Sequence, residues 1–404
     1  MKKANVGLAL LIAASGSIAA VNAQVRPAYQ YPPAPSSSGP ARVQLGSSPV
    51  YFTPFLGVAY GRDDNLFLTA ANEKSSDLAV LSPGFTLDTR SERTVLSVRY
   101  QGQAGRYFQS RDDDYVDHAT RAQFDVAFDR RNFLKLGLDY IRGHDPRGST
   151  DRAIAGSPDR YELTVPSVAY AFGTPGAQGR AEVYYSRPDR KYLNNRATTT
   201  ISDRRIQELG GAFFWRAMPK TYVLVEARGT DIDYRDPSVT LGARERRYYG
   251  GVSWEATAAT TGTLKFGRLE REFDRDRPKF SGSSWEGAIT WAPRSYSKFD
   301  LYTARQTNEA TGVGNFILSS ITGVTWSHSW TSSLITAVDL RYAKDEFQGA
   351  DRQDETKSIG LKVGYKFRRW LTLGAEYSHT QRDSNQRAFE YDKNLYLLTA
   401  TASM

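Results

Sequence analysis

The chain of 404 residues contains no cysteine at all. This absence excludes a disulfide framework, a thiolate metal site and a cysteine nucleophile, so hydrogen bonds and packing must stabilise the fold. The chain is also weakly hydrophobic, with a mean hydropathy of -0.53. So low a mean excludes a bundle of membrane helices. It does not exclude a transmembrane β-barrel, in which lipid-facing apolar residues alternate with polar lumen-facing ones.

The first 23 residues have the three parts of a secretory signal peptide. Lys2 and Lys3 form a short basic region, residues 6–14 are an apolar run, and residues 21–23 end in the small residue that cleavage requires. A retained anchor is disfavoured because this run is shorter than the ~20 residues that a spanning helix needs. No cysteine follows the cleavage site, which argues against a lipoprotein. We therefore expect export and a mature chain that begins at Gln24.

Residues 24–48 are rich in proline and serine and contain almost no large apolar residues. Such a composition cannot build a core, which predicts a flexible periplasmic segment. The segment is also too short to be the plug domain of a TonB-dependent receptor. The sequence thus divides into a signal peptide (1–23), a flexible segment (24–48) and one large domain (49–404).

The large domain repeats a single unit, a run with an apolar residue at every second position. In one such run Leu134, Leu136 and Leu138 alternate with Lys135 and Asp139. Period two keeps each apolar set on one surface of a sheet, whereas a helix would scatter it around its circumference. Counting the runs predicts an all-β domain of about 18 strands, within a range of 16–18.

The links between these runs alternate in length. Short links are expected at 88–92, 129–132, 174–178, 216–220, 258–262, 293–296, 327–329 and 367–370. Long polar links are expected at 61–76, 108–116, 142–159, 186–203, 232–246, 271–281, 305–315, 343–357 and 380–392. This alternation is typical of a transmembrane antiparallel β-barrel with short periplasmic turns and long outer loops. It places both ends of the chain in the periplasm.

Aromatic residues gather beside the short links, where rings at a membrane interface keep their polar edge near the lipid headgroups. Those that border short links are Trp215, Trp291, Trp330, Trp370, Phe133 and Tyr222. A soluble β-sandwich also has alternating strands, but it has no reason to place aromatics at one end of many hairpins. The pattern therefore favours the membrane barrel, located in the outer membrane of a Gram-negative bacterium. The final strand runs from Asn394 to the last residue, Met404, and resembles a barrel-assembly signal, although such signals usually end in an aromatic residue.

Residues 61–67 read Gly-Arg-Asp-Asp-Asn-Leu-Phe and are followed by Ser76-Asp77 and by residues 81–88, Leu-Ser-Pro-Gly-Phe-Thr-Leu-Asp. This region resembles the β-barrel porins found in bacterial exopolysaccharide operons. The motif covers only the first hairpin, and the strand rhythm extends the resemblance over most of the mature chain. The resemblance implies an outer-membrane pore associated with the export of a secreted polysaccharide, and it supplies no catalytic residues.

Any transport function must reside in the lumen, so charged residues were assigned to it by strand parity. The basic lumen candidates are Arg99, Arg121, Lys135, Arg180, Arg228, Lys265, Arg341, Lys362 and Lys366. Acidic candidates of similar number are Asp88, Asp125, Asp139, Glu182, Glu208, Glu226, Glu255, Glu286, Asp300, Asp339 and Glu376. The overall excess of 53 Lys and Arg over 44 Asp and Glu therefore predicts neither an anion-selective pore nor a nucleic-acid partner. Opposite charges are expected to neutralise each other across adjacent strands.

Three tyrosines are predicted to face the lumen, namely Tyr184, Tyr249 and Tyr302. Their rings could stack on the faces of sugars in a passing polymer. The alternative is that they pack against a loop folded into the lumen.

No enzyme, cofactor or metal site is predicted. The four histidines, His118, His144, His328 and His379, lie in no recognisable nucleophile arrangement. Acidic clusters at 63–64 and 112–114 lack the spacing of a calcium loop and are interpreted as solvated outer loops.

Two transport hypotheses remain, a conduit for a secreted polysaccharide and a general diffusion porin for small hydrophilic solutes. A structural barrel with a closed lumen is a third. The expected partners are outer-membrane lipid, the barrel-assembly machinery, the transported saccharide or solute and, for export, a periplasmic partner.

Overall fold

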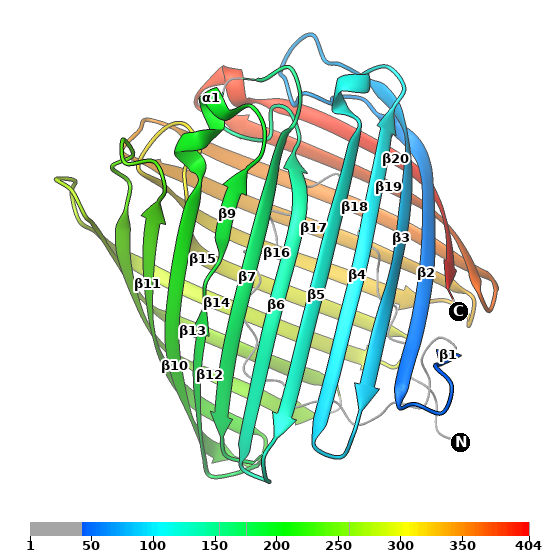
Figure 1. Cartoon of the computed structure of the whole chain (residues 1–404), viewed down its shortest axis with the longest axis vertical. Coiled ribbons are helices and arrows are strands. Elements are labelled where there is room, and N and C mark those ends of the chain that lie inside the picture. Colours follow the sequence, from blue (N-terminus) through cyan, green and yellow to red (C-terminus); the bar gives the residue numbers. More distant parts are fainter. Residues whose placement is uncertain (1–42, 153, 175, 258, 404) are drawn as a thin grey trace.

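The computed structural model describes residues 43–403 except 153, 175 and 258, which form one closed antiparallel barrel (Figure 1). The predicted signal peptide and residues 24–42 lie outside the described residues. Residues 43–48 belong to the segment predicted to be flexible, yet they fold back on the first barrel strand. Strand β1 (Val43–Gln44) pairs with Tyr51 and Phe52, and the Leu45 N–H donates to the carbonyl of Val50 at 2.9 Å.

Eighteen strands make up the barrel wall, as predicted, because β1 only extends it and β8 and β9 are two parts of one strand. The first half comprises β2 (Val50–Asp63), β3 (Ser76–Arg90), β4 (Thr94–Tyr107), β5 (Tyr115–Ala127), β6 (Asn132–Asp145), β7 (Asp159–Phe172), β8 (Gly179–Ser186), β9 (Asp189–Tyr192) and β10 (Arg204–Met218). The second half comprises β11 (Thr221–Tyr234), β12 (Ala243–Thr257), β13 (Thr260–Phe273), β14 (Phe280–Arg294), β15 (Ser297–Asn308), β16 (Phe316–Ser329), β17 (Leu334–Gln348), β18 (Gln353–Arg368), β19 (Leu371–Ser384) and β20 (Tyr391–Ser403).

The predicted alternation of faces is confirmed in β6. Leu136 and Leu138 are exposed on the outer surface, whereas Lys135 and Asp139 lie on the opposite face. The antiparallel register places Arg121 of β5 opposite Asp139, and their side chains form an ion pair. The apolar set therefore covers the outside of the barrel, and the charged set lines the inside.

Strand β2 closes the barrel against β20, over the register Phe55↔Ser403 to Asp63↔Leu395. Gly61 sits at this seam, where a Cβ would overlap the carbonyl oxygen of Tyr396. The absence of a side chain thus allows the two strands to approach closely.

The motif of residues 61–67 continues the same seam above the last paired residues. Lys393 pairs with Asp63 at 2.6 Å, and the Asn394 N–H donates to Asp64 at 2.6 Å. The Asn65 side chain donates to the carbonyl of Asp392 at 2.8 Å. The sequence motif therefore joins the first and last strands of the barrel.

The two ends of the barrel differ in their connections (Figure 1). One end, called the short-turn rim, has links of at most six residues, such as 219–220 and 369–370. The other, the long-loop rim, carries the segments 64–75, 108–114, 146–158, 193–203, 235–242, 274–279, 309–315, 349–352 and 385–390. Links of the two rims alternate along the chain, as predicted. However, the link 349–352 is as short as a turn of the other rim, although a long link of 15 residues was predicted there.

The strands extend farther than their polar ends suggested. At the top of β17 and β18 the pairing continues through Asp345↔Asp354 and Glu346↔Gln353, so residues interpreted as loop are part of the ladder. The turn predicted at 327–329 instead lies at 330–333, because β16 continues to Ser329. Charged residues can occupy a hydrogen-bonded strand wherever it rises beyond the apolar band, and composition alone does not mark this extension.

The short-turn rim carries the predicted aromatic belt. Trp215, Trp291, Trp330 and Trp370 are all exposed on the outer surface. Two other members were assigned wrongly. Phe133 is buried and shares the inward parity of Lys135, and the Tyr222 ring lies on the lumen side beneath the Arg180 guanidinium.

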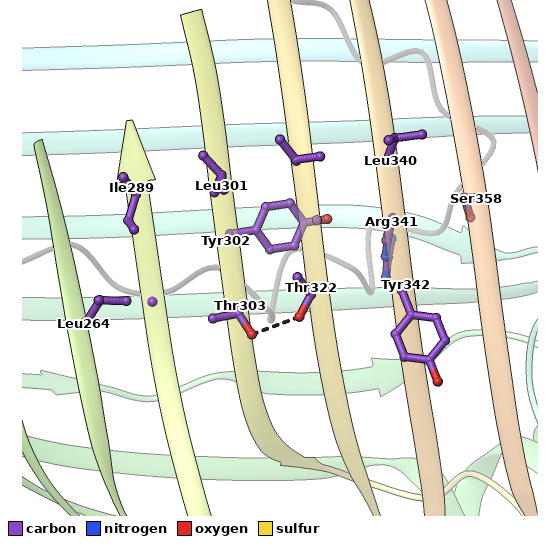
Figure 2. A pocket seen from close by; sticks show the side chains of 13 residues that line it. Leu264, Ile289, Leu301, Tyr302, Thr303, Thr322, Leu340, Arg341, Tyr342 and Ser358 are labelled. Carbon is purple, nitrogen blue, oxygen red and sulfur yellow. Dashed lines mark hydrogen bonds between the residues drawn. The ribbon is translucent and has the colours of Figure 1, made fainter. Parts of the chain in front are cut away.

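On the outer surface, β13 to β18 border a shallow apolar groove, bounded by Leu264, Ile289, Leu301, Leu340 and Tyr342 (Figure 2). Within it the Thr303 hydroxyl lies 3.0 Å from that of Thr322, and the Trp285 indole donates to Thr303 at 3.0 Å. These bonds satisfy polar groups that face outward.

In the part of the chain that the structure describes, helical structure is confined to the long-loop rim. It consists of α1 (Arg196–Thr199) and three 3-10 turns, at Arg111–Asp113, Thr200–Ser202 and Arg387–Phe389. Among the described residues, no helix has the length and apolar character to span a membrane.

Candidate functional site

The lumen wall from β8 to β15, called the compact wall, carries a buried group of side chains named the mid-wall cluster: Tyr184, Glu226, Arg228, Lys265 and Glu286. Arg228 binds Glu226 at 2.6 Å and Glu286 at 2.9 Å, and Lys265 binds the same two carboxylates at 2.8 and 2.6 Å. The Tyr184 hydroxyl donates to Glu226 at 2.7 Å. Two cations face two carboxylates, so the cluster is neutral.

Two of these ion pairs cross strands that are not neighbours, whereas the predicted pairing of adjacent strands is found between Lys265 of β13 and Glu286 of β14, which lie directly opposite each other. Glu226 of β11 reaches Lys265 of β13, and Arg228 of β11 reaches Glu286 of β14. Neighbouring strands lie about 4.8 Å apart, so long side chains that lie along the wall can span two or three of them. The side chains therefore follow the circumference and cover the wall.

A second buried group, the upper cluster, lies closer to the long-loop rim and consists of Glu245, Arg247, Arg271, Glu309 and Tyr234. Arg271 binds Glu245 at 2.8 Å and Glu309 at 2.9 Å, and the Tyr234 hydroxyl donates to Glu309 at 2.7 Å. Burial alone would raise the pKa of Glu309, but the Arg271 guanidinium and this hydroxyl outweigh it and hold the pKa below its ordinary value. Parity reasoning missed Glu309 because it lies in a link.

The opposite side of the lumen, called the open wall, consists of β16 to β20 together with β2 to β6. Here the pairs join adjacent strands, as predicted. Arg121 binds Asp139 at 2.5 Å, with 62% of the arginine side chain exposed. Lys362 binds Glu376 at 2.9 Å and both remain accessible, while Lys135 lies 4.0 Å from Asp125. Exposed pairs of this kind can exchange their hydrogen bonds for those of a solute.

The three predicted lumen tyrosines lie on the wall, each beside a glycine of a neighbouring strand. A Cβ added at Gly210, Gly267 or Gly323 would contact Tyr184, Tyr249 or Tyr302, respectively. In Figure 2 the Tyr302 ring extends from β15 across β16. Rings laid over glycines support the sheet, and these tyrosine–glycine pairs were a signal available in the sequence.

The three rings differ in what they leave open to the lumen. Tyr249 is 4% exposed, with Arg228 and Lys265 over its ring and its hydroxyl 2.8 Å from that of Ser284. It therefore cannot offer a face to a passing sugar. Tyr184 and Tyr302 remain partly exposed.

The remaining basic candidates are distributed over both walls. Arg180 stacks on Phe214 with 4.2 Å between guanidinium and ring centroid and lies 3.1 Å from Glu182, so it belongs to the compact wall. Arg99 is exposed and lies opposite Arg121 in the register of the open wall. Arg341 of β17 lies in register opposite Gly323, the residue over which the Tyr302 ring lies (Figure 2).

The link between β6 and β7 extends over the mouth of the barrel; it is called the strap and comprises residues 146–152 and 154–158. At its start Arg147 donates to Asp113 at 2.7 Å and covers the Phe67 ring at 4.2 Å. Arg152 donates to Asp159 at 2.7 Å and to Ser202 at 3.1 Å. These contacts attach the strap to neighbouring loops.

The middle of the strap reaches the far side of the mouth. The Asp151 carboxylate accepts a hydrogen bond from Arg352 at 2.7 Å, and the Asp151 N–H donates to the hydroxyl of Thr311 at 3.2 Å. Arg352 belongs to the link between β17 and β18, and Thr311 to the link between β15 and β16. Eight strands separate β6 from β16 in either direction, so this contact joins loops from opposite sides of the mouth.

The interpretation of the acidic clusters as solvated loops holds for Asp112 and Asp114, which are exposed, but is wrong for Asp63 and Asp113. Asp63 is fully buried against Lys393, and Asp113 is buried against Arg147. Asp114 accepts a hydrogen bond from the Tyr107 N–H at 2.6 Å. These carboxylates hold loops to strands. Among the described residues, no group of three or more His, Cys, Asp or Glu could hold a metal ion.

The histidines serve local contacts in the part of the chain that the structure describes. His118 bonds the Tyr100 hydroxyl at 2.9 Å, and His379 bonds the Asn394 side chain at 3.1 Å. His144 lies 3.0 Å from the Asp117 carboxylate, and His328 packs among aromatic rings of the outer belt, 4.3 Å from that of Trp330. None of these contacts joins a histidine to a serine or threonine hydroxyl.

Comparison with known protein families agrees with the barrel architecture. A family model described as "Putative beta-barrel porin 2" matches residues 47–404. A search of curated proteins gives no match. Among solved structures, the chain is similar to OpdK of Pseudomonas aeruginosa, with 12% identity, a TM-score of 0.48, and coverage of 87% of this chain and 99% of that one. It is similar to OccK9 (OpdG) of the same organism, with 13% identity, a TM-score of 0.49, and coverage of 88% and 98%.

Proposed function

Since the chain belongs to the putative beta-barrel porin 2 family, we propose that it is an outer-membrane pore that serves as a conduit for a secreted polysaccharide. The observation that carries this proposal is the open wall. Its partly exposed ion pairs, Arg121–Asp139 and Lys362–Glu376, offer donors and acceptors to a hydroxylated chain without a large desolvation cost. The role is transport rather than catalysis, and the N-terminal 23 residues direct export.

The partly exposed rings of Tyr184 and Tyr302 add apolar surface on which a sugar face can pack. Of the three predicted lumen tyrosines, Tyr249 is no longer a stacking candidate, because its ring is covered. Membrane lipid surrounds the apolar outer face, and a periplasmic export partner delivers the polymer to the short-turn rim.

A second candidate function, diffusion of small hydrophilic solutes, is favoured by one observation. The strap divides the mouth, with Asp151 bound to Arg352 on the far side. A divided mouth passes small solutes more readily than a polymer. Polymer export therefore requires the strap to move.

The experiment that separates the two is deletion of the gene in a strain that makes the polymer. Export predicts loss of surface polysaccharide or its accumulation in the periplasm, restored by the wild-type chain but not by the Tyr184→Ala, Tyr302→Ala double variant. Normal surface polymer combined with reduced uptake of small hydrophilic solutes would contradict the export proposal and support a diffusion porin for small solutes.

The orientation can be tested with a matched pair of cysteine variants, since the chain has no cysteine of its own. Pro237 lies exposed in the link 235–242 at the long-loop rim, and Pro219 lies exposed in a short turn. An impermeant maleimide should label Pro237→Cys on intact cells but label Pro219→Cys only after the outer membrane is opened. The reverse result would invert the orientation.

A further inference from the structure

Arg352 is held in place at the rim of the mouth independently of the strap. Its guanidinium lies between the rings of Phe347, at 4.1 Å, and Phe389, at 3.3 Å. One edge of the fork binds Asp354 at 3.0 and 2.5 Å, and Asp354 is itself held by the Ser384 hydroxyl at 2.7 Å. A planar cation fixed on both faces and one edge is preorganised, so its remaining edge can bind a second oxyanion with little loss of entropy.

That remaining edge is occupied by Asp151, which comes from the opposite side of the barrel. The bond from Arg352 is 2.7 Å long, and the side chains are 1% and 11% exposed. Thr311 adds to this attachment, with its hydroxyl 3.2 Å from the Asp151 N–H and 3.5 Å from the carboxylate, and Gly312 lies against the Asp151 backbone. Without Asp151, Arg352 and Asp354 form a neutral pair, so a different anion can take the vacated position without facing an excess of negative charge.

We propose that Arg352 is a carboxylate-binding site at the outer mouth, that Asp151 occupies it in the closed state, and that a solute carboxylate opens the mouth by taking the place of Asp151. The strap then loses its attachment to the far side but stays tethered by Arg147 and Arg152. This inference rests on the proposed pore function, and it deepens that function by naming acidic saccharides as the class of solute that opens the channel.

The physical basis is competition between the Asp151 carboxylate and a solute carboxylate for the same N–H groups of the Arg352 guanidinium. A hydrogen bond to a charged group contributes about 1.5–3 kcal/mol, so loss of the Asp151 carboxylate shifts the closed-to-open equilibrium about tenfold or more. The shift depends on differential binding, because only the open state leaves the edge free for a solute.

The first test measures the conductance of the purified full-length barrel in planar bilayers. The substitution Asp151→Asn should raise the open fraction about tenfold at constant ionic strength. The matched control is Asp112→Asn, at an exposed carboxylate of the same rim, which should leave conductance unchanged. Equal conductance of Asp151→Asn and the wild type would overturn the proposal. A barrel that never conducts in any variant would instead refute the pore function.

The second test uses sodium galacturonate as the probe and an equal concentration of galactose with sodium chloride as its control. In the wild type, galacturonate should raise the open fraction and galactose should not. The Asp151→Asn variant should respond to neither, because its strap is already released. A wild type that responds equally to both would overturn the carboxylate site even if Asp151→Asn conducts more.

A third test fixes the strap covalently. In Asp151→Cys, Thr311→Cys the two cysteines adjoin, and the cysteine-free background excludes other disulfides. Oxidation should lower conductance and abolish the galacturonate response, and reduction should restore conductance to the level of Asp151→Asn. Oxidation should leave the conductance of each single cysteine variant unchanged. Unchanged conductance of the oxidised double variant, with the cross-link confirmed by mass spectrometry, would show that the strap does not control the mouth.

Discussion

The compact wall and the open wall of the lumen contain the same kinds of side chain but hold them differently. In the mid-wall cluster Arg228 and Lys265 share two carboxylates, and all four side chains are buried. On the open wall Arg121 and Lys362 each have one carboxylate partner, and Arg121 remains 62% exposed. Strand parity is therefore enough to assign a charge to the lumen, but it does not decide whether that charge is available to a solute.

The difference has a cause in the neighbouring residues. Between the charged positions of the compact wall lie flat rings and small residues, such as Tyr249 beside Gly267, which let long side chains lie along the circumference. The pairs of the open wall are formed between directly opposed residues, such as Lys362 and Glu376. Pairs that span several strands along the circumference, such as Arg228 and Glu286, cover the compact wall, whereas the opposed pairs of the open wall leave their outer edges to water and solutes.

The largest effect is expected from Arg228→Met. This change leaves Glu226 and Glu286 buried with only Lys265 between them, which should lower the free energy of unfolding by about 3–5 kcal/mol. The matched change on the open wall, Arg121→Met, should cost less than about 1 kcal/mol. Urea unfolding of both barrels in lipid vesicles, followed by tryptophan fluorescence, measures the difference.

A second variant tests the cause of that loss. Adding Glu286→Leu to Arg228→Met leaves Lys265 paired with Glu226 alone, and much of the lost stability should return. Equal destabilisation by Arg228→Met and Arg121→Met would contradict the distinction between the walls.

The next effect compares the two faces of a single strand. Leu136→Arg places a charge among the lipid chains and should cost about 2–4 kcal/mol if it lies near the midplane, while Lys135→Gln on the lumen side should be tolerated. The measurement is the fraction of heat-stable folded barrel on gels. Similar losses for both variants would mean that the assignment of faces is wrong for β6.

The fold could be predicted from the sequence because a lipid-facing strand must alternate apolar and polar residues with a strict period of two. Leu136 and Leu138 mark their face whatever their neighbours are, so strand number, closure and the tryptophan belt could all be predicted. The candidate site was predicted only in part. The lumen face of Arg228 and Lys265 follows from parity, but their burial depends on partners two and three strands away.

The mouth could not be predicted, because loops have no period. The contact between Asp151 and Arg352 joins residues 201 positions apart, and nothing local marks either residue. Asp63 and Asp113 were interpreted as solvated for the same reason, since the partners that bury them, Lys393 and Arg147, lie in other segments.

A smaller, pH-dependent effect is expected at Glu309 in the upper cluster. Its pKa is lower in the folded barrel than in the unfolded chain, where an ordinary value is about 4.3. Its contribution to stability is therefore present above about pH 4.3 and is lost as pH falls through the folded pKa. Glu309→Gln should be less stable than the wild type at neutral pH, and the gap should narrow in acid. A gap that widens below pH 4 would contradict the assigned direction.

The smallest effect concerns ion selectivity on the open wall. Because Lys362 and Glu376 are accessible, Lys362→Gln should favour cations, and Glu376→Gln should favour anions, each by about twofold or less. Reversal potentials across a salt gradient measure these shifts, and unfolding by urea should be nearly unchanged. The same substitutions at Lys265 and Glu286 should instead reduce stability and leave selectivity almost constant, since those charges are buried. Shifts of the same sign at Lys362 and Glu376 would mean that ions do not pass along this wall.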